Sequence, residues 1–152
     1  MVVTRTLSKS YALAGLRFGY LIAQPELIDR LMRMKDSYNC DTLSIVGATA
    51  AMSDQVWQRE NRQLILNTRA RMVSSLESLG FKIPQSQANF LWCTHPTASL
   101  QQVYEGLKAE RILVRYLAFS DWGDGLRISV GTEAQIDALL TLLPPLLARA
   151  GG

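Results

Sequence analysis

The most informative stretch of the chain is Thr6-Leu7-Ser8-Lys9-Ser10-Tyr11-Ala12-Leu13-Ala14-Gly15-Leu16-Arg17-Phe18-Gly19-Tyr20. The residues from Met1 to Leu7 are rich in β-branched side chains and predict a strand that enters this stretch. The residues from Leu16 to Ile22 predict a second strand. The sequence therefore places hydroxyl side chains, a lysine, two glycines and an arginine around a loop that joins two strands.

This loop composition suits a site that holds a phosphate and an aldehyde together. A lysine forms an imine with a carbonyl only while its amine is unprotonated, so a nearby positive charge must favour the neutral form of Lys9. Arg17 supplies that charge, and its guanidinium can bind a phosphate through two parallel hydrogen bonds. Thr6 and Ser8 offer hydroxyl groups at the end of the first strand. The predicted chemistry is imine formation by Lys9 beside a phosphate site.

A second informative pattern lies near the end of the chain, where Asp124-Gly125 precedes Leu126-Arg127-Ile128-Ser129-Val130. Alternation predicts a strand with Leu126, Ile128 and Val130 on one face and Arg127 and Ser129 on the other. The planar guanidinium of Arg127 is suited to paired hydrogen bonds with a carboxylate. Its alternative is a structural ion pair with Asp121 or Asp124.

The remaining elements alternate between helices and strands, which indicates the α/β class. The predicted helices are Pro25 to about Lys35, Thr42 to Met52, Ser53 or Asp54 to Leu79, one from about Leu100, and one from Thr132 with Ile136, Leu139, Leu140 and Leu143 buried. The further predicted strands are Ala88 to Cys93 and Ile112 to Tyr116. The loss of periodicity at residues 36–41 predicts a boundary between an α/β opening piece and a compact α/β domain.

Composition excludes several classes of protein. The 152 residues carry a net charge of +3 and are 48% hydrophobic and 19% charged, as in an ordinary globular domain. The basic residues are scattered, which argues against a nucleic-acid partner, and no apolar run is long enough to span a membrane. Cys40 and Cys93 are predicted to be free thiols, which fits a cytoplasmic protein. Cys93 and His95 lack further ligands at compatible spacing, so no metal site is expected.

With these residues in place, the stretch from Thr6 to Tyr20 resembles the active-site lysine motif of the class I and II aminotransferases, which depend on pyridoxal 5'-phosphate. The resemblance implies that Lys9 is the catalytic residue, which forms the Schiff base with the cofactor and moves a proton. It implies that Thr6, Ser8 and Arg17 hold the cofactor phosphate. The segment from Asp124 to Thr132 resembles the family segment whose arginine, here Arg127, pairs with the substrate carboxylate.

Motif order and spacing are most similar to the histidinol-phosphate aminotransferase branch, which moves an amino group between histidinol phosphate and 2-oxoglutarate in histidine biosynthesis. In that branch an arginine after a Gly-Ile-Leu-Val-like strand contacts the substrate, and Arg115 stands at the matching place. The threonine-phosphate decarboxylases share much of the pattern and remain an alternative. A further alternative is a catalytically silent α/β domain that only folds and associates.

The resemblance implies the C-terminal part of the fold type I transferases, an α/β fold. Residues 1–36 would be the end of the large cofactor-binding domain, and residues 37–152 the small C-terminal domain. The segments that contribute an aspartate to the pyridine nitrogen and an aromatic ring to the cofactor lie outside this part of a family member. The partners implied are a small-molecule amino donor, a 2-oxo acid, and a second copy in a homodimer, with no nucleic acid and no membrane.

Overall fold

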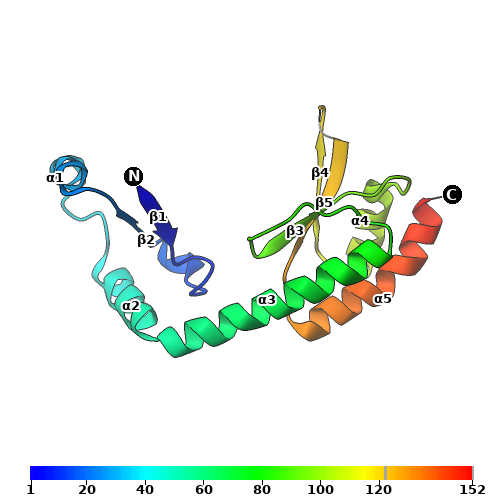
Figure 1. Ribbon diagram of the computed structural model, residues 1–152, viewed down its shortest axis with the longest axis horizontal. Coiled ribbons are helices and arrows are strands. Elements are labelled where there is room, and N and C mark those ends of the chain that lie inside the picture. The colour runs from blue at the N-terminus through cyan, green and yellow to red at the C-terminus, as the bar shows by residue number, and fades with distance from the viewer. Residues whose placement is uncertain (122, 152) are drawn as a thin grey trace. The chain divides into compact units, whose positions relative to one another are not determined.

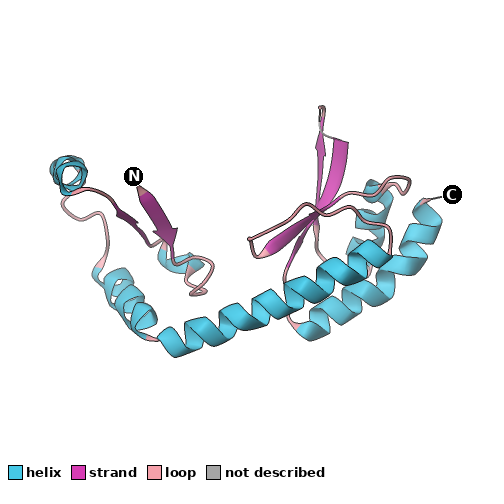
Figure 2. Cartoon of the chain, in the orientation of Figure 1, coloured by secondary structure: helices cyan, strands magenta, loops and turns pink. Residues whose placement is uncertain are grey.

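The computed structural model describes residues 1–121 and 123–151, which form two compact units, Met1–Gln63 and Leu64–Gly152. Figure 1 and Figure 2 show the helices and strands of both units. The units divide within helix α3 (Gln55–Ser78), later in the chain than the domain boundary expected at residues 36–37. That boundary concerns the domains of the family and stays a prediction.

The first unit is built on a two-stranded antiparallel sheet. Strands β1 (Val3–Thr6) and β2 (Gly19–Ile22) pair from Val3 opposite Ile22 to Thr6 opposite Gly19. The loop between them contains a short 3₁₀ helix, η1 (Ala14–Leu16). The predicted second strand therefore begins only at Gly19, because residues 14–16 are helical and Arg17 adopts a left-handed backbone conformation that ends the 3₁₀ turn.

Two helices follow in the first unit, close to their predicted limits. Helix α1 (Pro25–Met34) begins with Pro25, whose fixed φ suits the first helical turn. Helix α2 (Thr42–Ser53) begins after Asp41, whose side chain accepts a hydrogen bond from the Ser44 N–H at 2.9 Å. Asp54 likewise accepts a hydrogen bond from the Trp57 N–H at 3.0 Å at the start of α3, as predicted.

The second unit contains an antiparallel sheet in the order β3-β5-β4, formed by Phe90–Cys93, Gly123–Ser129 and Arg115–Phe119. Helices α4 (Leu100–Ala109) and α5 (Glu133–Ala150) complete it together with the rest of α3. One face of the sheet packs against these helices in a core formed by Met72, Leu76, Phe81, Leu91, Cys93, Leu100, Val103, Leu107, Leu126, Ile128, Ile136, Leu139 and Leu143. Three of the four predicted core positions of α5 are buried, and Leu140 is partly buried.

A polar cluster ties α3 to α5 in the second unit. The guanidinium of Arg71 contacts the carboxylates of Glu133 at 2.6 Å and Asp137 at 2.8 Å, and Thr68 donates a hydrogen bond to Glu133. Thr132 forms a capping box with Gln135 at the start of α5. These contacts fix the first turns of α5, which directly follow β5.

The predicted strand Ile112–Tyr116 is displaced along the chain, since β4 covers Arg115–Phe119. Ile112 and Val114 instead pack against the core in an extended segment, and the Ile112 N–H donates to Leu107 O at 2.9 Å just after α4. Strand β5 is also longer than predicted and includes Asp124 and Gly125. The pairing of β4 with β5 decides both changes, from Arg115 opposite Arg127 to Phe119 opposite Gly123.

Candidate functional site

Thr6 is the last residue of β1, and Ser8, Lys9 and Arg17 lie on the loop that joins β1 to β2 in the first unit. The loop is closed at its base by the pairing of Thr6 with Gly19 and by a hydrogen bond from Leu7 N–H to Phe18 O at 3.2 Å. Leu7 is completely buried, so it fixes the residues on either side of it to the body of the unit. The structure therefore brings the four predicted cofactor residues onto a single short connection.

The lysine lies in a tight turn of this loop. Lys9 O accepts a hydrogen bond from the Ala12 N–H at 3.1 Å, and Ala12 has a positive φ of 55°. Thr6 Oγ1 accepts a hydrogen bond from the Ser8 N–H at 3.1 Å, which turns the chain directly after β1. The Lys9 side chain is exposed to solvent. The turn therefore presents the amine at the surface of the unit.

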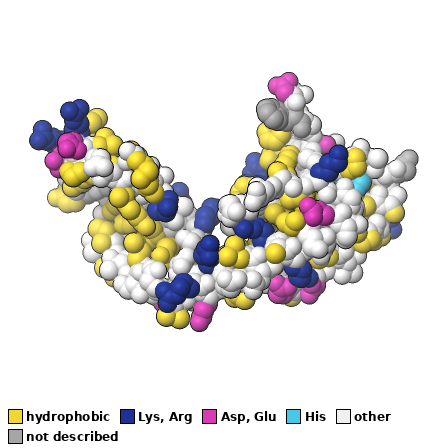
Figure 3. Space-filling model, viewed as in Figure 1, with side chains coloured by type: hydrophobic (Ala, Val, Ile, Leu, Met, Phe, Trp, Pro, Cys, Tyr) yellow, Lys and Arg dark blue, Asp and Glu magenta, His cyan; other side chains and the backbone are white. Residues whose placement is uncertain are grey.

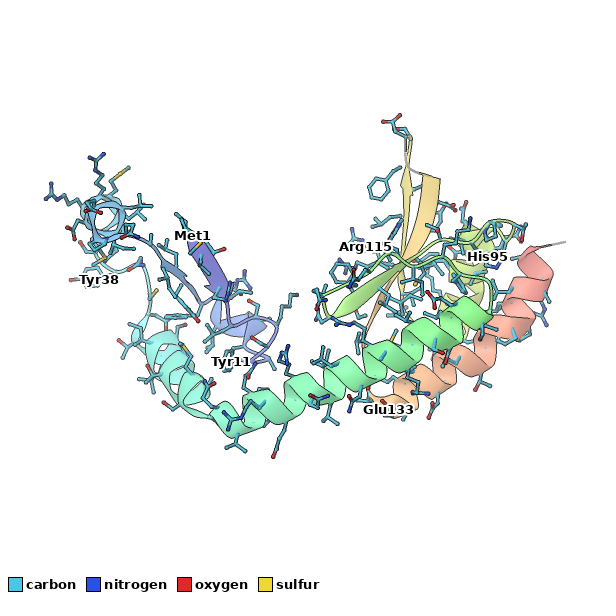
Figure 4. The ribbon with its side chains drawn as sticks, viewed as in Figure 1. Met1, Tyr11, Tyr38, His95, Arg115 and Glu133 are labelled. Carbon is cyan, nitrogen blue, oxygen red and sulfur yellow. The ribbon has the colours of Figure 1, made fainter. Side chains whose placement is uncertain are left out.

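Arg17 closes the other side of the loop. Its guanidinium donates a hydrogen bond to Ala14 O at 2.7 Å, and its backbone has a φ of 53°. The residue is exposed, and a guanidinium has five N–H donors, so donors remain for an anion beside the one that binds Ala14. Tyr11, from the same loop, extends toward α3, where its hydroxyl accepts a hydrogen bond from Gln55 Nε2 at 3.3 Å (Figure 4).

Arg115 and Arg127 lie in the second unit and are direct partners across strands β4 and β5. Partners in an antiparallel pair point to the same side of the sheet, and both arginines are exposed on the face opposite the core. The guanidinium of Arg127 lies over the ring of Phe90, 5.3 Å from its centre. No acidic side chain forms an ion pair with Arg127 among the residues that the structure describes. The two positive groups therefore lie next to each other on the exposed face of the sheet.

Sequence reasoning identified the arginines singly and did not predict that they are neighbours. It also missed Phe90 as the ring beneath Arg127, although alternation in β3 places Phe90 on the same face as Trp92. Ser44 was missed as well. Its hydroxyl lies 3.1 Å from Leu16 O, next to Arg17, and the signal in the sequence was its place at the third position of α2 after the capping Asp41.

Several other features of the described residues lie apart from the six predicted site residues. A hollow of about 740 Å³ in the first unit is lined by residues of β1, β2 and α1, and none of the six predicted site residues lines it. Cys93 is buried in the core, which raises the pKa of its thiol to about 12, and His95 accepts a hydrogen bond from the Ala98 N–H. Within residues 1–121 and 123–151, no group of acidic, Cys and His side chains is arranged to hold a metal ion, and no helix there is long and apolar enough to cross a membrane.

Comparisons with known proteins agree on one family. Residues 1–143 match the model of the family described as aminotransferase class I and II. A histidinol-phosphate aminotransferase of Rhodopirellula baltica is 53% identical over 141 residues, which are 93% of this chain and 39% of that protein. The corresponding enzyme of Gluconacetobacter diazotrophicus is 41% identical over 152 residues, 43% of its length. The chain thus spans about two fifths of these curated relatives.

Solved structures show the same fold at lower identity. The histidinol-phosphate aminotransferase from Clostridium acetobutylicum superposes with a TM-score of 0.86 at 23% identity, covering 97% of this chain and 46% of that one. The enzyme from Sinorhizobium meliloti, solved in complex with pyridoxal 5'-phosphate, superposes with a TM-score of 0.84 at 24% identity, covering 97% and 41%. The expected α/β architecture, the C-terminal part of fold type I, is confirmed. The chain belongs to the class I and II aminotransferases.

Proposed function

We propose that this chain provides the lysine and the phosphate-binding loop of a pyridoxal-phosphate-dependent aminotransferase. The observation that carries the proposal is the loop between β1 and β2, which holds Lys9, two hydroxyl side chains and Arg17 on one connection pinned by buried Leu7. The hydroxyls of Thr6 and Ser8 and the guanidinium of Arg17 suit a phosphate dianion. The exposed Lys9 amine suits an aldehyde. The residues present therefore fit this cofactor.

When it is bound, pyridoxal phosphate supplies an electron sink for the substrate carbon. The chain's own residues have separate tasks. Lys9 would hold the cofactor through its amine and would move a proton at the substrate carbon. Thr6, Ser8 and Arg17 would hold the phosphate and so orient the cofactor for Lys9.

For the substrate we propose histidinol phosphate as amino donor and 2-oxoglutarate as acceptor. The proposal is supported by the 53% identity to an enzyme of that name and by the paired Arg115 and Arg127. Histidinol phosphate carries a phosphate and 2-oxoglutarate carries carboxylates, and a guanidinium binds either group through paired hydrogen bonds. In this proposal Arg127 orients the carboxylate of the oxo acid, and Arg115 adds the second positive charge.

The domain assignment follows from the same family. We infer that residues 1–36 belong to the end of the large cofactor-binding domain and residues 37–152 to the small domain.

Cys40 and Cys93 are free thiols, which supports a reducing compartment such as the cytoplasm.

We also infer that the complete enzyme is a homodimer, and the surface of the first unit supports association. Helix α2 carries no charged side chain, yet Leu43 is 77% exposed and Val46 is 61% exposed. Apolar side chains gather over the visible face of this unit (Figure 3). A helix of this composition is normally covered by other protein. Sedimentation equilibrium of the chain at several concentrations tests this: mass growth with concentration is expected, and a monomer throughout would contradict it.

The test of the cofactor site is reductive trapping. The 152-residue chain is incubated with pyridoxal phosphate, reduced with borohydride, digested and analysed by peptide mass. The chain has four lysines, so adducts can be compared among Lys9, Lys35, Lys82 and Lys108. We expect the adduct to concentrate on Lys9 and to disappear in Lys9→Ala, while the control Lys35→Ala keeps it.

Equal labelling of all four lysines would contradict the proposal and favour the silent α/β domain. The substrate part is tested separately by thermal unfolding with histidinol phosphate and with histidinol, which lacks the phosphate. Stabilisation by histidinol phosphate alone, lost in Arg115→Gln, is expected. Equal effects of both compounds would exclude the arginine pair as a phosphate site.

A further inference from the structure

The backbone at Arg17 is held in a conformation that non-glycine residues rarely adopt. Its φ of 53° lies in the left-handed region, which persists in a residue with a β-carbon only where the surroundings enforce it. Two local contacts contribute, from Arg17 N–H to Ala14 O at 3.4 Å and from the guanidinium to the same oxygen at 2.7 Å. Both contacts lie within one turn, so neither fixes the loop to the rest of the unit.

A contact from helix α2 acts on the Leu16–Arg17 peptide itself, in addition to the anchoring of the loop by Leu7. Ser44 Oγ donates a hydrogen bond to Leu16 O at 3.1 Å, across 28 positions of the chain. The carbonyl of Leu16 and the N–H of Arg17 belong to the same peptide plane. Because rotation of that plane changes φ of Arg17, a hydrogen bond to Leu16 O restrains the backbone that carries the guanidinium.

Ser44 is itself held in place by burial and by hydrogen bonds. It is 5% exposed, and it is one of two buried polar side chains among the described residues. Its N–H donates to Asp41 Oδ1 at 2.9 Å, and its hydroxyl lies 2.5 Å from Asp41 Oδ2. The hydroxyl thus lies within hydrogen-bond distance of both the Asp41 carboxylate and Leu16 O. The capping group of α2 and the loop carbonyl are thereby linked through one side chain.

Helix α2 also receives the side chain of Leu16. A β-carbon at Gly47 would lie 2.9 Å from Leu16 Cδ1, so glycine there leaves room for the end of the Leu16 side chain. Ser44 and Gly47 are three residues apart and therefore lie on the same face of the helix. One face of α2 thus holds both the backbone and the side chain of the residue before Arg17.

We propose that Ser44 is a positioning residue for the phosphate of the cofactor, acting through the Leu16–Arg17 peptide. Ser44 itself does not contact the phosphate. It holds the left-handed backbone of Arg17, so that the guanidinium is presented in one orientation before any ligand arrives. The inference rests on the proposed cofactor site, and it adds a buried hydroxyl from a distant helix to that site.

The first experiment reads the loop itself and needs no cofactor. Hydrogen–deuterium exchange is measured on peptides covering residues 13–19 in the wild type, in Ser44→Ala and in Thr49→Ala. Thr49 is the matched control, because its hydroxyl lies on the same helix and donates to Ile45 O at 2.8 Å within α2. Loss of one hydrogen bond should speed exchange of the loop amides about fivefold in Ser44→Ala. Unchanged exchange would overturn the proposal.

The second experiment asks whether the effect concerns the phosphate. Binding of pyridoxal phosphate and of pyridoxal, which lacks the phosphate, is compared in the same three proteins. We expect Ser44→Ala to weaken binding of pyridoxal phosphate about tenfold, the scale of one charge-assisted hydrogen bond, and to leave pyridoxal unchanged. Equal weakening of both ligands would overturn the positioning role.

The two failures can be told apart. If the wild type binds neither ligand through Lys9, the proposed cofactor site is wrong and the phosphate role of Ser44 falls with it, although the exchange data still show whether Ser44 holds the loop. If the wild type binds pyridoxal phosphate through Lys9 and Ser44→Ala binds it equally well, only the inference about Ser44 is wrong.

Discussion

The guanidinium groups of Arg115 and Arg127 in the second unit should repel each other when no anion is bound. Arg115 and Arg127 are register partners, and such partners have α-carbons about 4.5–5.5 Å apart. Like charges directly opposite in a sheet cost about 0.2–1 kcal/mol. Coulomb's law gives a similar value, since two charges about 8 Å apart in water repel by about 0.5 kcal/mol. We therefore expect an unfavourable coupling of about 0.5 kcal/mol between these side chains.

A double-mutant cycle isolates that coupling. The free energy of unfolding of the second unit is measured by urea denaturation, followed by circular dichroism, for wild type, Arg115→Gln, Arg127→Gln and the double variant. Arg127→Gln also loses the contact with the Phe90 ring, but this loss occurs on both sides of the cycle and cancels. Urea is preferred to guanidinium because it leaves the ionic strength low.

Salt provides the internal control. At about 1 M salt the screening length is about 3 Å, so the repulsion should vanish, whereas a packing interaction between the two side chains would remain. A coupling that is favourable at low salt, or that does not change with salt, would refute the reasoning. Millimolar phosphate at low salt should stabilise the wild type by mass action and have a much smaller effect on the double variant.

Three further predictions concern packing and titration. Gly125→Ala should lower the free energy of unfolding by about 1–3 kcal/mol, because a β-carbon there would lie 2.3 Å from Trp92 Cζ2; an unchanged urea midpoint would contradict this. At pH 8, iodoacetamide should label Cys40 and spare Cys93, whose pKa is raised to about 12 by burial; peptide mass analysis showing equal labelling would disprove it. The Ser44 hydroxyl and N–H lower the pKa of Asp41 from its ordinary value of 3.8. The stabilising effect of the Asp41 carboxylate is therefore present above pH 3.8 and lost as the pH falls below that value. Asp41→Asn should flatten the acid end of a plot of unfolding free energy against pH. A plot parallel to that of the wild type would count against this prediction.

The helices could be predicted from sequence because their signals are local. Asp54 and Thr132 stand at the caps that their side chains form, and Pro25 stands at the first turn of α1. Within each helix, the apolar spacing of 3.6 residues depends on no other element. These elements differ from the predictions by a residue or two at their ends.

The strands of the second unit were harder because their limits depend on partners. Asp124-Gly125 has the local composition of a turn, yet both residues lie in β5, where Gly125 leaves room for the Trp92 indole from the neighbouring strand. Ile112 and Val114 alternate like a strand but fill the core without joining the ladder. Alternation indicates which side chains are buried, and it does not indicate where a ladder begins.

The loop of the first unit shows a related difference between residue identity and conformation. The sequence identified Lys9 and Arg17 as the groups with chemistry, because their types and surroundings suit a phosphate and an aldehyde. It could not give the left-handed backbone of Arg17, which depends on Ser44, a residue 28 positions from Leu16. The place of Ser44 next to the cap of α2 can be seen in the sequence, but nothing in either segment indicates its contact with Leu16.

The placement of the arginine pair depends both on local alternation in the sequence and on contacts between strands. The core of the second unit determines the geometry of this pair. Alternation places Arg127 on the exposed face of β5, but a slip of one residue in β4 would turn Arg115 toward the helices. Next to the arginines, Tyr116 lies opposite Leu126, which is completely buried, and Tyr116 packs against the same core. That pair favours the observed register over a slip of one residue, because such a slip would move Tyr116 to the exposed face. The position of Arg115 beside Arg127 is therefore a consequence of hydrophobic packing on the other face of the sheet, and substitutions of Leu126 should disturb anion binding as well as stability.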